Sequence, residues 1–308
     1  MNPEGTSDYC LKMVGGSAEQ FARTGCMELG ERYVAMARYK LVDEVTGEGF
    51  QCDPNVRKRC PVLRVQSRLG TQRSTLTPGR TIGKSSATDW NTLSGIFIAD
   101  DLSAKADAFR VFFADIPKGK DLIVDKVSVS KLPMDCSELI MNGNMDLGRV
   151  SFWNKYGRSG AFDDDVVGYI RYNGRKSRWN GPQYEARQLL DYRCLTVGRT
   201  FNIHARIKLF AAGSNMGAMC DLTSTSSATG CPQFRIFLYN KTNTRRAHTI
   251  FKLRTYASET WDPNGFNQLQ DTFTIPEING IGKVLIILRD FNEKLDVAVD
   301  DFSIHPAD

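Results

Sequence analysis

The chain has 308 residues, of which 41% are hydrophobic and 24% are charged, a composition typical of a globular protein long enough for two domains. Forty lysine and arginine residues against 35 aspartate and glutamate residues give a net charge of +5. This charge excludes nucleic acid as an expected partner unless it is concentrated in one patch. No apolar run approaches the ~20 residues that a membrane-spanning helix needs, so no membrane span is expected.

Short runs of alternating apolar and polar residues predict strands along the whole chain, whereas helical periodicity is nearly absent. The runs are bounded by Gly, Pro, Asn and Asp, which favour turns. In chain order, the clearest predicted strands are 33–41, 109–113, 122–129, 201–209, 234–238, 284–288 and 297–304. Strands of this length and spacing predict an all-β fold, with a β-sandwich or jelly roll as its architecture.

The sequence contains a long internal repeat. The run Cys26–Leu41 returns as Cys194–Leu209, with a cysteine, a glycine, an aromatic residue and an Ala-Arg-x-Lys-Leu ending in register. Further matching pairs are Cys60–Val65 with Cys231–Ile236, Trp90 with Trp261, and Val124–Val129 with Val299–Ile304. A repeat of about 170 residues has the size of a whole domain rather than of a solenoid unit.

The repeat predicts two tandem β-sandwich domains, residues 1–133 and 134–308. The boundary is placed near Pro133, where a predicted strand ends, and no Gly/Ser-rich linker separates the copies. The first copy has fewer residues before Gly15 than the second has before the matching Gly174. We therefore expect the first domain to be N-terminally truncated by one strand and its loop, which would leave an unpaired sheet edge.

Four cysteines occupy matching loops between predicted strands: Cys52 and Cys60 in the first copy, and Cys220 and Cys231 in the second. One disulfide in each loop is the favoured interpretation, and buried free thiols are the alternative. The sequence leaves open the pairing of Cys10, Cys26, Cys136 and Cys194. Disulfides indicate an oxidising compartment, so an extracellular, secreted or cell-wall location is expected, although the N-terminus has no signal-peptide pattern.

The second copy resembles the CenC-type carbohydrate-binding modules, jelly-roll domains that are appended to xylanases, glucanases and related glycoside hydrolases. The resemblance lies in the order and spacing of four segments: Asn142-Gly-x-x-Asp146, Arg175-x-x-x-Trp179-Asn-Gly-Pro182, Gly198-Arg-Thr-Phe201 and Val299-Asp-x-Phe-Ser303. It spans nearly all of the second copy but covers the first only from about Cys10 to Pro133. It implies a galactose-binding-like β-sandwich that binds polysaccharide.

The second copy also has the side chains that sugar binding requires. A pyranose packs a face of C–H groups on an aromatic ring, and its hydroxyl edges need planar polar partners. The alternative for two of the candidates is that Trp179 packs in the core and Arg175 makes a surface ion pair. The candidate carbohydrate-binding residues are Arg175, Trp179, Asn180, Gln183, Tyr184 and, as a weaker candidate, Tyr239.

The remaining tryptophans, Trp90, Trp153 and Trp261, are expected mainly to pack. The first copy has no arginine at the position of Arg175 and lacks the Trp-Asn-Gly-Pro segment. We therefore expect it to bind sugar weakly or not at all.

The resemblance further implies a structural calcium ion in the second domain, bound by Asp146 and Asp300. Calcium takes six to eight oxygen ligands, so backbone carbonyls and water would have to complete the site. Asp125 matches Asp300 in the repeat, but the first copy lacks the segment that would supply its partner. The alternative is that Asp300 and Asp301 simply lie at the end of a strand.

No motif indicates a catalytic site: the three histidines are scattered, and no Gly-x-Ser-x-Gly, phosphate loop or His-Glu-x-x-His is present. We therefore expect non-catalytic polysaccharide binding, as an independent module or as the accessory region of a glycoside hydrolase. The expected ligand is a β-glucan, a xylan or an anionic glycan. The alternative is an extracellular adhesion or matrix protein whose β-sandwich binds protein partners.

Overall fold

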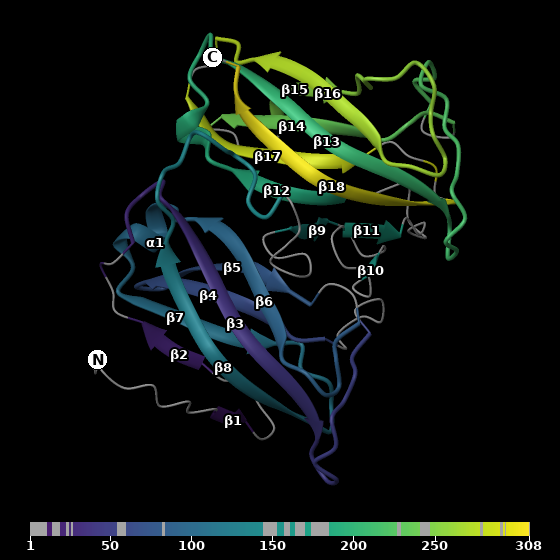
Figure 1. The fold of residues 1–308 in the computed structure, drawn as a ribbon. Helices are drawn as coiled ribbons and strands as arrows, with labels where there is room; N and C mark the ends of the chain where they lie inside the picture. The colour runs from purple at the N-terminus through teal and green to yellow at the C-terminus, as the bar shows by residue number, and fades with distance from the viewer. Residues whose placement is uncertain are drawn as a thin grey trace. The chain divides into compact units, whose positions relative to one another are not determined.

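The structure is a computed structural model in which the chain forms two compact units, Met1–Leu132 and Pro133–Asp308 (Figure 1). It describes residues 11–13, 19–22, 25, 27–53, 60–81, 84–143, 153–156, 161–163, 170–173, 185–226, 229–240, 247–277, 280–289, 292 and 294–307. Within these ranges the only helical segments are α1 (Asp101–Lys105) and the 3-10 turn η1 (Tyr192–Cys194). The rest of the regular structure is β-strand, which confirms the predicted all-β class.

The first unit is built from eight described strands in two antiparallel sheets. The strands are β1 (Leu11–Met13), β2 (Glu19–Ala22), β3 (Arg32–Asp43), β4 (Val62–Leu69), β5 (Gln72–Arg80), β6 (Asn91–Ile98), β7 (Ala108–Ala114) and β8 (Lys120–Lys131). Sheet I has the order β1-β8-β3-β6, and sheet II has the order β2-β7-β4-β5. Strands that are distant in sequence are neighbours in both sheets, as is typical of a sandwich.

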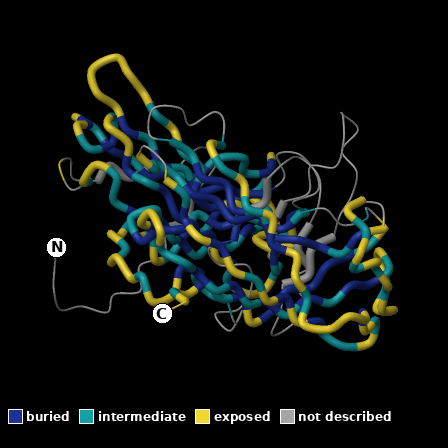
Figure 2. Tube along the Cα trace, turned by 90° about the horizontal axis from the view of Figure 1, so that it is seen from above, coloured by how far each residue is buried: buried dark blue, intermediate teal, exposed yellow. Residues whose placement is uncertain are grey.

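Alternation along the strands forms the core of the first unit, because successive side chains point to opposite faces of a sheet. Ala37, Tyr39 and Leu41 of β3 are almost completely buried, and Leu63 and Val65 of β4 meet them from the other sheet. Figure 2 shows buried residues gathered along inner stretches of the trace and exposed residues mainly along outer stretches. The apolar positions that predicted the strands are thus the positions that form the core.

The second unit has ten described strands in two five-stranded sheets. They are β9 (Asn154–Tyr156), β10 (Ala161–Asp163), β11 (Ile170–Asn173), β12 (Glu185–Leu190), β13 (Thr200–Ala211), β14 (Gln233–Asn240), β15 (Ala247–Leu253), β16 (Asn267–Thr274), β17 (Ile281–Arg289) and β18 (Leu295–Pro306). Sheet III has the order β10-β11-β18-β13-β16, and sheet IV has the order β15-β14-β17-β12-β9. Sheet III repeats the arrangement of sheet I, and sheet IV repeats that of sheet II.

Strand register corrects one pair of the sequence repeat. Asn91 is paired with Tyr39 in sheet I, and Asn267 is paired with Ile207, the residue that matches Tyr39, in sheet III. The first residues of β6 and β16 are therefore equivalent, and Trp90 matches Phe266, which precedes Asn267 directly. The prediction that Trp90 matches Trp261 was wrong, because it aligned two tryptophans across a loop and not through the strand that follows.

Three disulfides join described cysteines. Cys52–Cys60 closes the loop between β3 and β4, and Cys220–Cys231 closes the matching loop between β13 and β14, so both predicted pairs are confirmed. A third disulfide, which the sequence left open, joins Cys136 to Cys194 beside η1. It ties the start of the second unit to the 3-10 turn that precedes β13. These bonds are consistent with an oxidising compartment.

Two of the tryptophans expected to pack lie in the core of the second unit. Trp153 is 2% exposed, and its ring lies 5.5 Å from that of Phe302. Phe302 in turn stacks on Phe234 at 4.2 Å between ring centroids, which gives the core a column of three aromatic rings. Trp261 is 5% exposed, and its Nε1 donates a hydrogen bond to the backbone oxygen of Ala218 at 2.9 Å.

Candidate functional site

Only part of the predicted carbohydrate site falls within the described structure. The predicted residues that lie outside the described ranges are Arg175, Trp179, Asn180, Gln183 and Tyr184. The sixth, Tyr239, lies on β14 in sheet IV. The segment that carries the other five directly precedes β12 in the chain, and β12 is also a strand of sheet IV. Both parts of the predicted site are therefore connected to this sheet.

Tyr239 lies on the face of sheet IV that points away from the core. Phe234, Ile236 and Leu238 of β14 are completely buried in the sandwich. The intervening side chains lie on the opposite face because the side-chain period of a strand is two. Two of these are aromatic: the ring of Tyr239 lies 6.5 Å from that of Phe237, with an angle of 22° between the planes. A pair of aromatic rings therefore occupies the outer face.

Strand register aligns an apolar row across this outer face. Leu189 of β12 is opposite Leu285 of β17, Leu285 is opposite Phe237 of β14, and Phe237 is opposite Ile250 of β15. Since neighbouring strands lie ~4.8 Å apart, the four backbones span about 14 Å. Leu285 and Phe237 are buried, whereas Ile250 at the end of the row is 45% exposed. We call these four residues the apolar row.

Positively charged side chains lie on both sides of the apolar row. On one side the aligned residues are Arg187, Ile287, Arg235 and Lys252, and on the other they are Lys283, Tyr239 and Ala247. The Nζ atom of Lys283 lies 5.5 Å from the centre of the Tyr239 ring, within the range of a cation–π contact. Burial, and next the positive charge of Arg187, lower the pKa of Lys283. The face is thus apolar along its middle and cationic at its margins.

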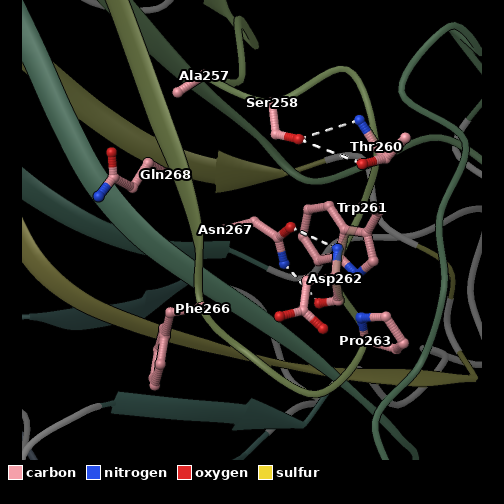
Figure 3. Close-up of a pocket in the computed structure, with 9 residues that line it drawn as sticks. All are labelled: Ala257, Ser258, Thr260, Trp261, Asp262, Pro263, Phe266, Asn267 and Gln268. Atoms are coloured by element: carbon pink, nitrogen blue, oxygen red, sulfur yellow. Dashed lines mark hydrogen bonds between the residues drawn. The ribbon is translucent and has the colours of Figure 1, made fainter.

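A hollow of about 490 Å³ lies in the connection between β15 and β16 (Figure 3). Its polar groups mainly bond one another. Asn267 accepts a hydrogen bond from the backbone N–H of Asp262 and donates one to its carbonyl oxygen, both at 2.8 Å. Asp262 also accepts from the backbone N–H of Asn264, and Ser258 from that of Thr260. These bonds explain how the loop is held together without a ligand.

The predicted calcium pair is described only at Asp300, because Asp146 lies outside the described ranges. The Asp300 carboxylate forms an ion pair with Arg206, 3.0 Å from its Nη2 atom, and accepts the backbone N–H of Asp301 at 2.8 Å. Arg206 also pairs with the Asp301 carboxylate at 3.0 Å and lies 4.9 Å from the centre of the Phe266 ring. A guanidinium therefore contacts the one carboxylate of the predicted calcium pair that the structure describes.

The first unit repeats this arrangement. Arg38 lies 3.8 Å from the Asp125 carboxylate and 5.2 Å from the centre of the Trp90 ring, which is the equivalent of Phe266. Both arginines follow an irregularity in register on their strand. No cluster of three or more potential metal ligands is found in the described part of the chain. The described residues at Asp300 form an arginine–aspartate pair, and the calcium site, which also needs Asp146, stays a prediction.

The sequence missed most residues of the outer face of sheet IV: Phe237, Leu189, Leu285, Ile250, Arg187 and Lys283. One signal was present in the run 234–239. Its even-numbered residues are apolar and form the core, so the odd-numbered Phe237 and Tyr239 had to face outwards. The other residues had no local signal, because only strand pairing places β15 and β17 beside β14, and β12 beside β17.

Comparisons with known proteins give structural similarities only. No family model and no curated protein matches the chain. The N-terminal CBM22-1-CBM22-2 tandem domain of Xyn10C from Paenibacillus barcinonensis is similar over 99% of this chain and 95% of its own, with 11% identity and a TM-score of 0.38. The CBM22-1 xylan-binding domain of the same protein covers 53% of this chain and 91% of its own, at 14% identity and a TM-score of 0.35.

A CBM4 structure is similar over 54% of this chain and 99% of its own, at 13% identity and a TM-score of 0.34. At these identities and TM-scores the similarities carry no weight for function, which has to be argued from the residues of the site. No helix in the described part of the chain is long and apolar enough to span a membrane.

Proposed function

We propose that the second unit is a non-catalytic module that binds a polysaccharide across the outer face of sheet IV. The observation that carries the proposal is the apolar row with Tyr239 and a cationic margin beside it. The row crosses the strands, with Leu285 and Phe237 buried at its centre and Ile250 exposed at its end beside β14. The segment with Arg175, Trp179 and Tyr184 leads into β12 and belongs to the proposed site.

The chemistry of this face matches that of a sugar polymer. Pyranose rings would pack their C–H faces on Tyr239 and Ile250, which offer apolar surface without requiring a charge. The guanidinium of Arg187 and the ammonium of Lys283 would donate hydrogen bonds to hydroxyl groups at the edges of the rings. A polymer that meets many such contacts in sequence can be bound without any one contact being strong.

The proposed setting is extracellular, where the three disulfides would be stable. The chain would act there as an independent binding module or as the accessory region of a glycoside hydrolase. The ligand classes proposed for the second unit are β-glucans and xylans, whose rings carry no charge. A protein ligand for the same face is the competing proposal.

Affinity gel electrophoresis against β-glucan, xylan and mannan tests the proposal. The wild-type chain should be retarded by at least one neutral polymer, and Tyr239→Ala should weaken that binding about tenfold, or about 1.4 kcal/mol. The matched control is Phe266→Ala, which removes an aromatic ring from the loop that directly precedes β16 of sheet III. Its retardation should equal that of the wild type.

The proposal fails if no polymer retards a chain that circular dichroism shows to be folded, and the protein-binding alternative then gains support. It also fails if Tyr239→Ala and Phe266→Ala lose retardation equally, because the effect would then not belong to sheet IV.

A further inference from the structure

Sheet II of the first unit presents an outer face that carries arginines on three adjacent strands. The inward residues of β4 and β7 include Leu63, Val65 and Val111, which are buried in the core. Their neighbours at the other parity therefore face outwards. The outer cations on the described strands of this sheet are Arg64, Arg68, Arg73, Arg80 and Arg110. We call these five residues the arginine face.

Three of the four positions of the apolar row are polar in the first unit and form a polar row, and the fourth, that of Leu189, is Phe21 on β2. Gln66 stands where the second unit has Phe237, Arg110 stands where it has Leu285, and Thr75 stands where it has Ile250. The polar row is connected by hydrogen bonds. Arg110 donates from Nε to Oε1 of Gln66 at 2.9 Å, and Gln66 donates from Nε2 to the Thr75 hydroxyl at 2.8 Å.

The hydrogen bonds in this row fix the position of the Arg110 guanidinium. Its Cζ atom lies 4.9 Å from the centre of the Phe112 ring, and Phe112 is opposite Arg64 in the strand ladder. An arginine held by an amide on one side and an aromatic ring on the other loses less conformational freedom when it binds a ligand. This arrangement supports recognition by a preorganised group.

The arginine face carries an excess of positive charge. Asp115 lies 3.4 Å from Arg64, and Asp107 lies 3.6 Å from Arg68. These two carboxylates against five guanidinium groups leave about +3 for these seven side chains, and Glu19 of β2, which is opposite Phe112 in the ladder of the same sheet, reduces the net charge to about +2. The excess belongs to one sheet face and is hidden in the small net charge of the whole chain.

Two pairs of arginines on this face repel each other. Arg68 and Arg73 are directly opposite in the ladder, an arrangement that destabilises a sheet. Partial desolvation and then the charge of Arg64 lower the pKa of Arg80. A bound anion would relieve both repulsions. All five cations are arginines, whose planar guanidinium groups bind carboxylates through two parallel hydrogen bonds.

We propose that the arginine face of the first unit binds a carboxylated polysaccharide, a polyuronate, independently of the second unit. Charge complementarity selects this ligand: carboxylates at regular intervals along a polymer can meet guanidinium groups on three adjacent strands. The inference extends the polysaccharide binding proposed above to the unit from which the sequence led us to expect little or none. The inference rests on that proposal only in taking the ligand to be a polysaccharide.

Binding of the full chain to polygalacturonate and to the same polymer fully methyl-esterified tests the inference, because esterification removes the charge and keeps the backbone. The wild type should bind only the carboxylated form. The double variant Arg80→Gln/Arg110→Gln should weaken this binding tenfold or more, since charged hydrogen bonds are lost. Lys126→Gln on β8 of sheet I is the matched charge control and should leave it unchanged.

Loss of binding in the double variant with retention in Lys126→Gln and Tyr239→Ala supports the inference. Equal binding of the esterified polymer, or an equal loss in the double variant and in Lys126→Gln, overturns it. A chain retarded by neutral polymer but not by polygalacturonate overturns it while the proposal for the second unit stands. Binding of polygalacturonate but of no neutral polymer supports the inference and overturns the proposal for the second unit. Tighter binding of a single-stranded DNA oligonucleotide than of polygalacturonate also overturns it.

Discussion

The asparagine at the start of β16 provides a test of how the β15–β16 loop is held. Asn267 is 8% exposed, and its side-chain amide makes two hydrogen bonds of 2.8 Å to the backbone of Asp262. Asn267→Ala removes both bonds and leaves the N–H and carbonyl of Asp262 without these partners. At about 1 kcal/mol for each bond, the unfolding free energy should fall by about 2 kcal/mol.

For a unit of this size, that loss corresponds to a decrease in Tm of about 4 to 8 °C in scanning calorimetry. The first unit provides an internal replicate. Asn91 accepts from the N–H of Ser86 at 2.8 Å and donates to its carbonyl at 3.0 Å, so Asn91→Ala should cause a similar loss. Gln268→Ala, at the exposed neighbouring position, is the control. A change below about 0.5 kcal/mol in both asparagine variants would refute the reasoning.

Three further predictions concern other parts of the chain. Burial raises the pKa of Glu138, so its contribution to stability falls as the pH rises from the ordinary range of a glutamate through the raised value. Glu138→Gln can still accept hydrogen bonds from the backbone N–H groups of Ile140 and Ile304. In urea titrations this variant should therefore gain stability relative to the wild type as the pH rises from 4 to 8. If the difference in unfolding free energy between variant and wild type is the same at both pH values, the prediction is wrong. Because Asp300 is paired with an arginine, EDTA should leave Tm unchanged, whereas a decrease that calcium reverses would support the calcium prediction. Gly95→Ala should cost about 2 kcal/mol in urea unfolding, because the added Cβ would overlap the carbonyl oxygen of Pro78, and wild-type stability would contradict this.

Much of the fold could be predicted from local patterns. Alternation at 201–209 and 234–238 gave strands, and the repeat of Cys26–Leu41 gave two domains of one kind. The disulfides Cys52–Cys60 and Cys220–Cys231 could be predicted because each closes a short loop. Cys136–Cys194 could not, since its partners are 58 residues apart and nothing in the sequence indicates that they meet.

The sequence by itself determined the all-β class and which side chains of each strand share a face, because both follow from the alternation of neighbouring side chains. It also determined the tandem repeat, because the matching runs can be read directly. It could not determine which strands lie side by side. Tertiary structure decided that Leu189, Leu285, Phe237 and Ile250 form one row, and that Arg206 binds Asp300. It also decided that Gln66, Arg110 and Thr75 form the corresponding polar row in the first unit. The physical reason is that pairing between distant strands sets the register, and register places side chains from separate parts of the chain on a common face.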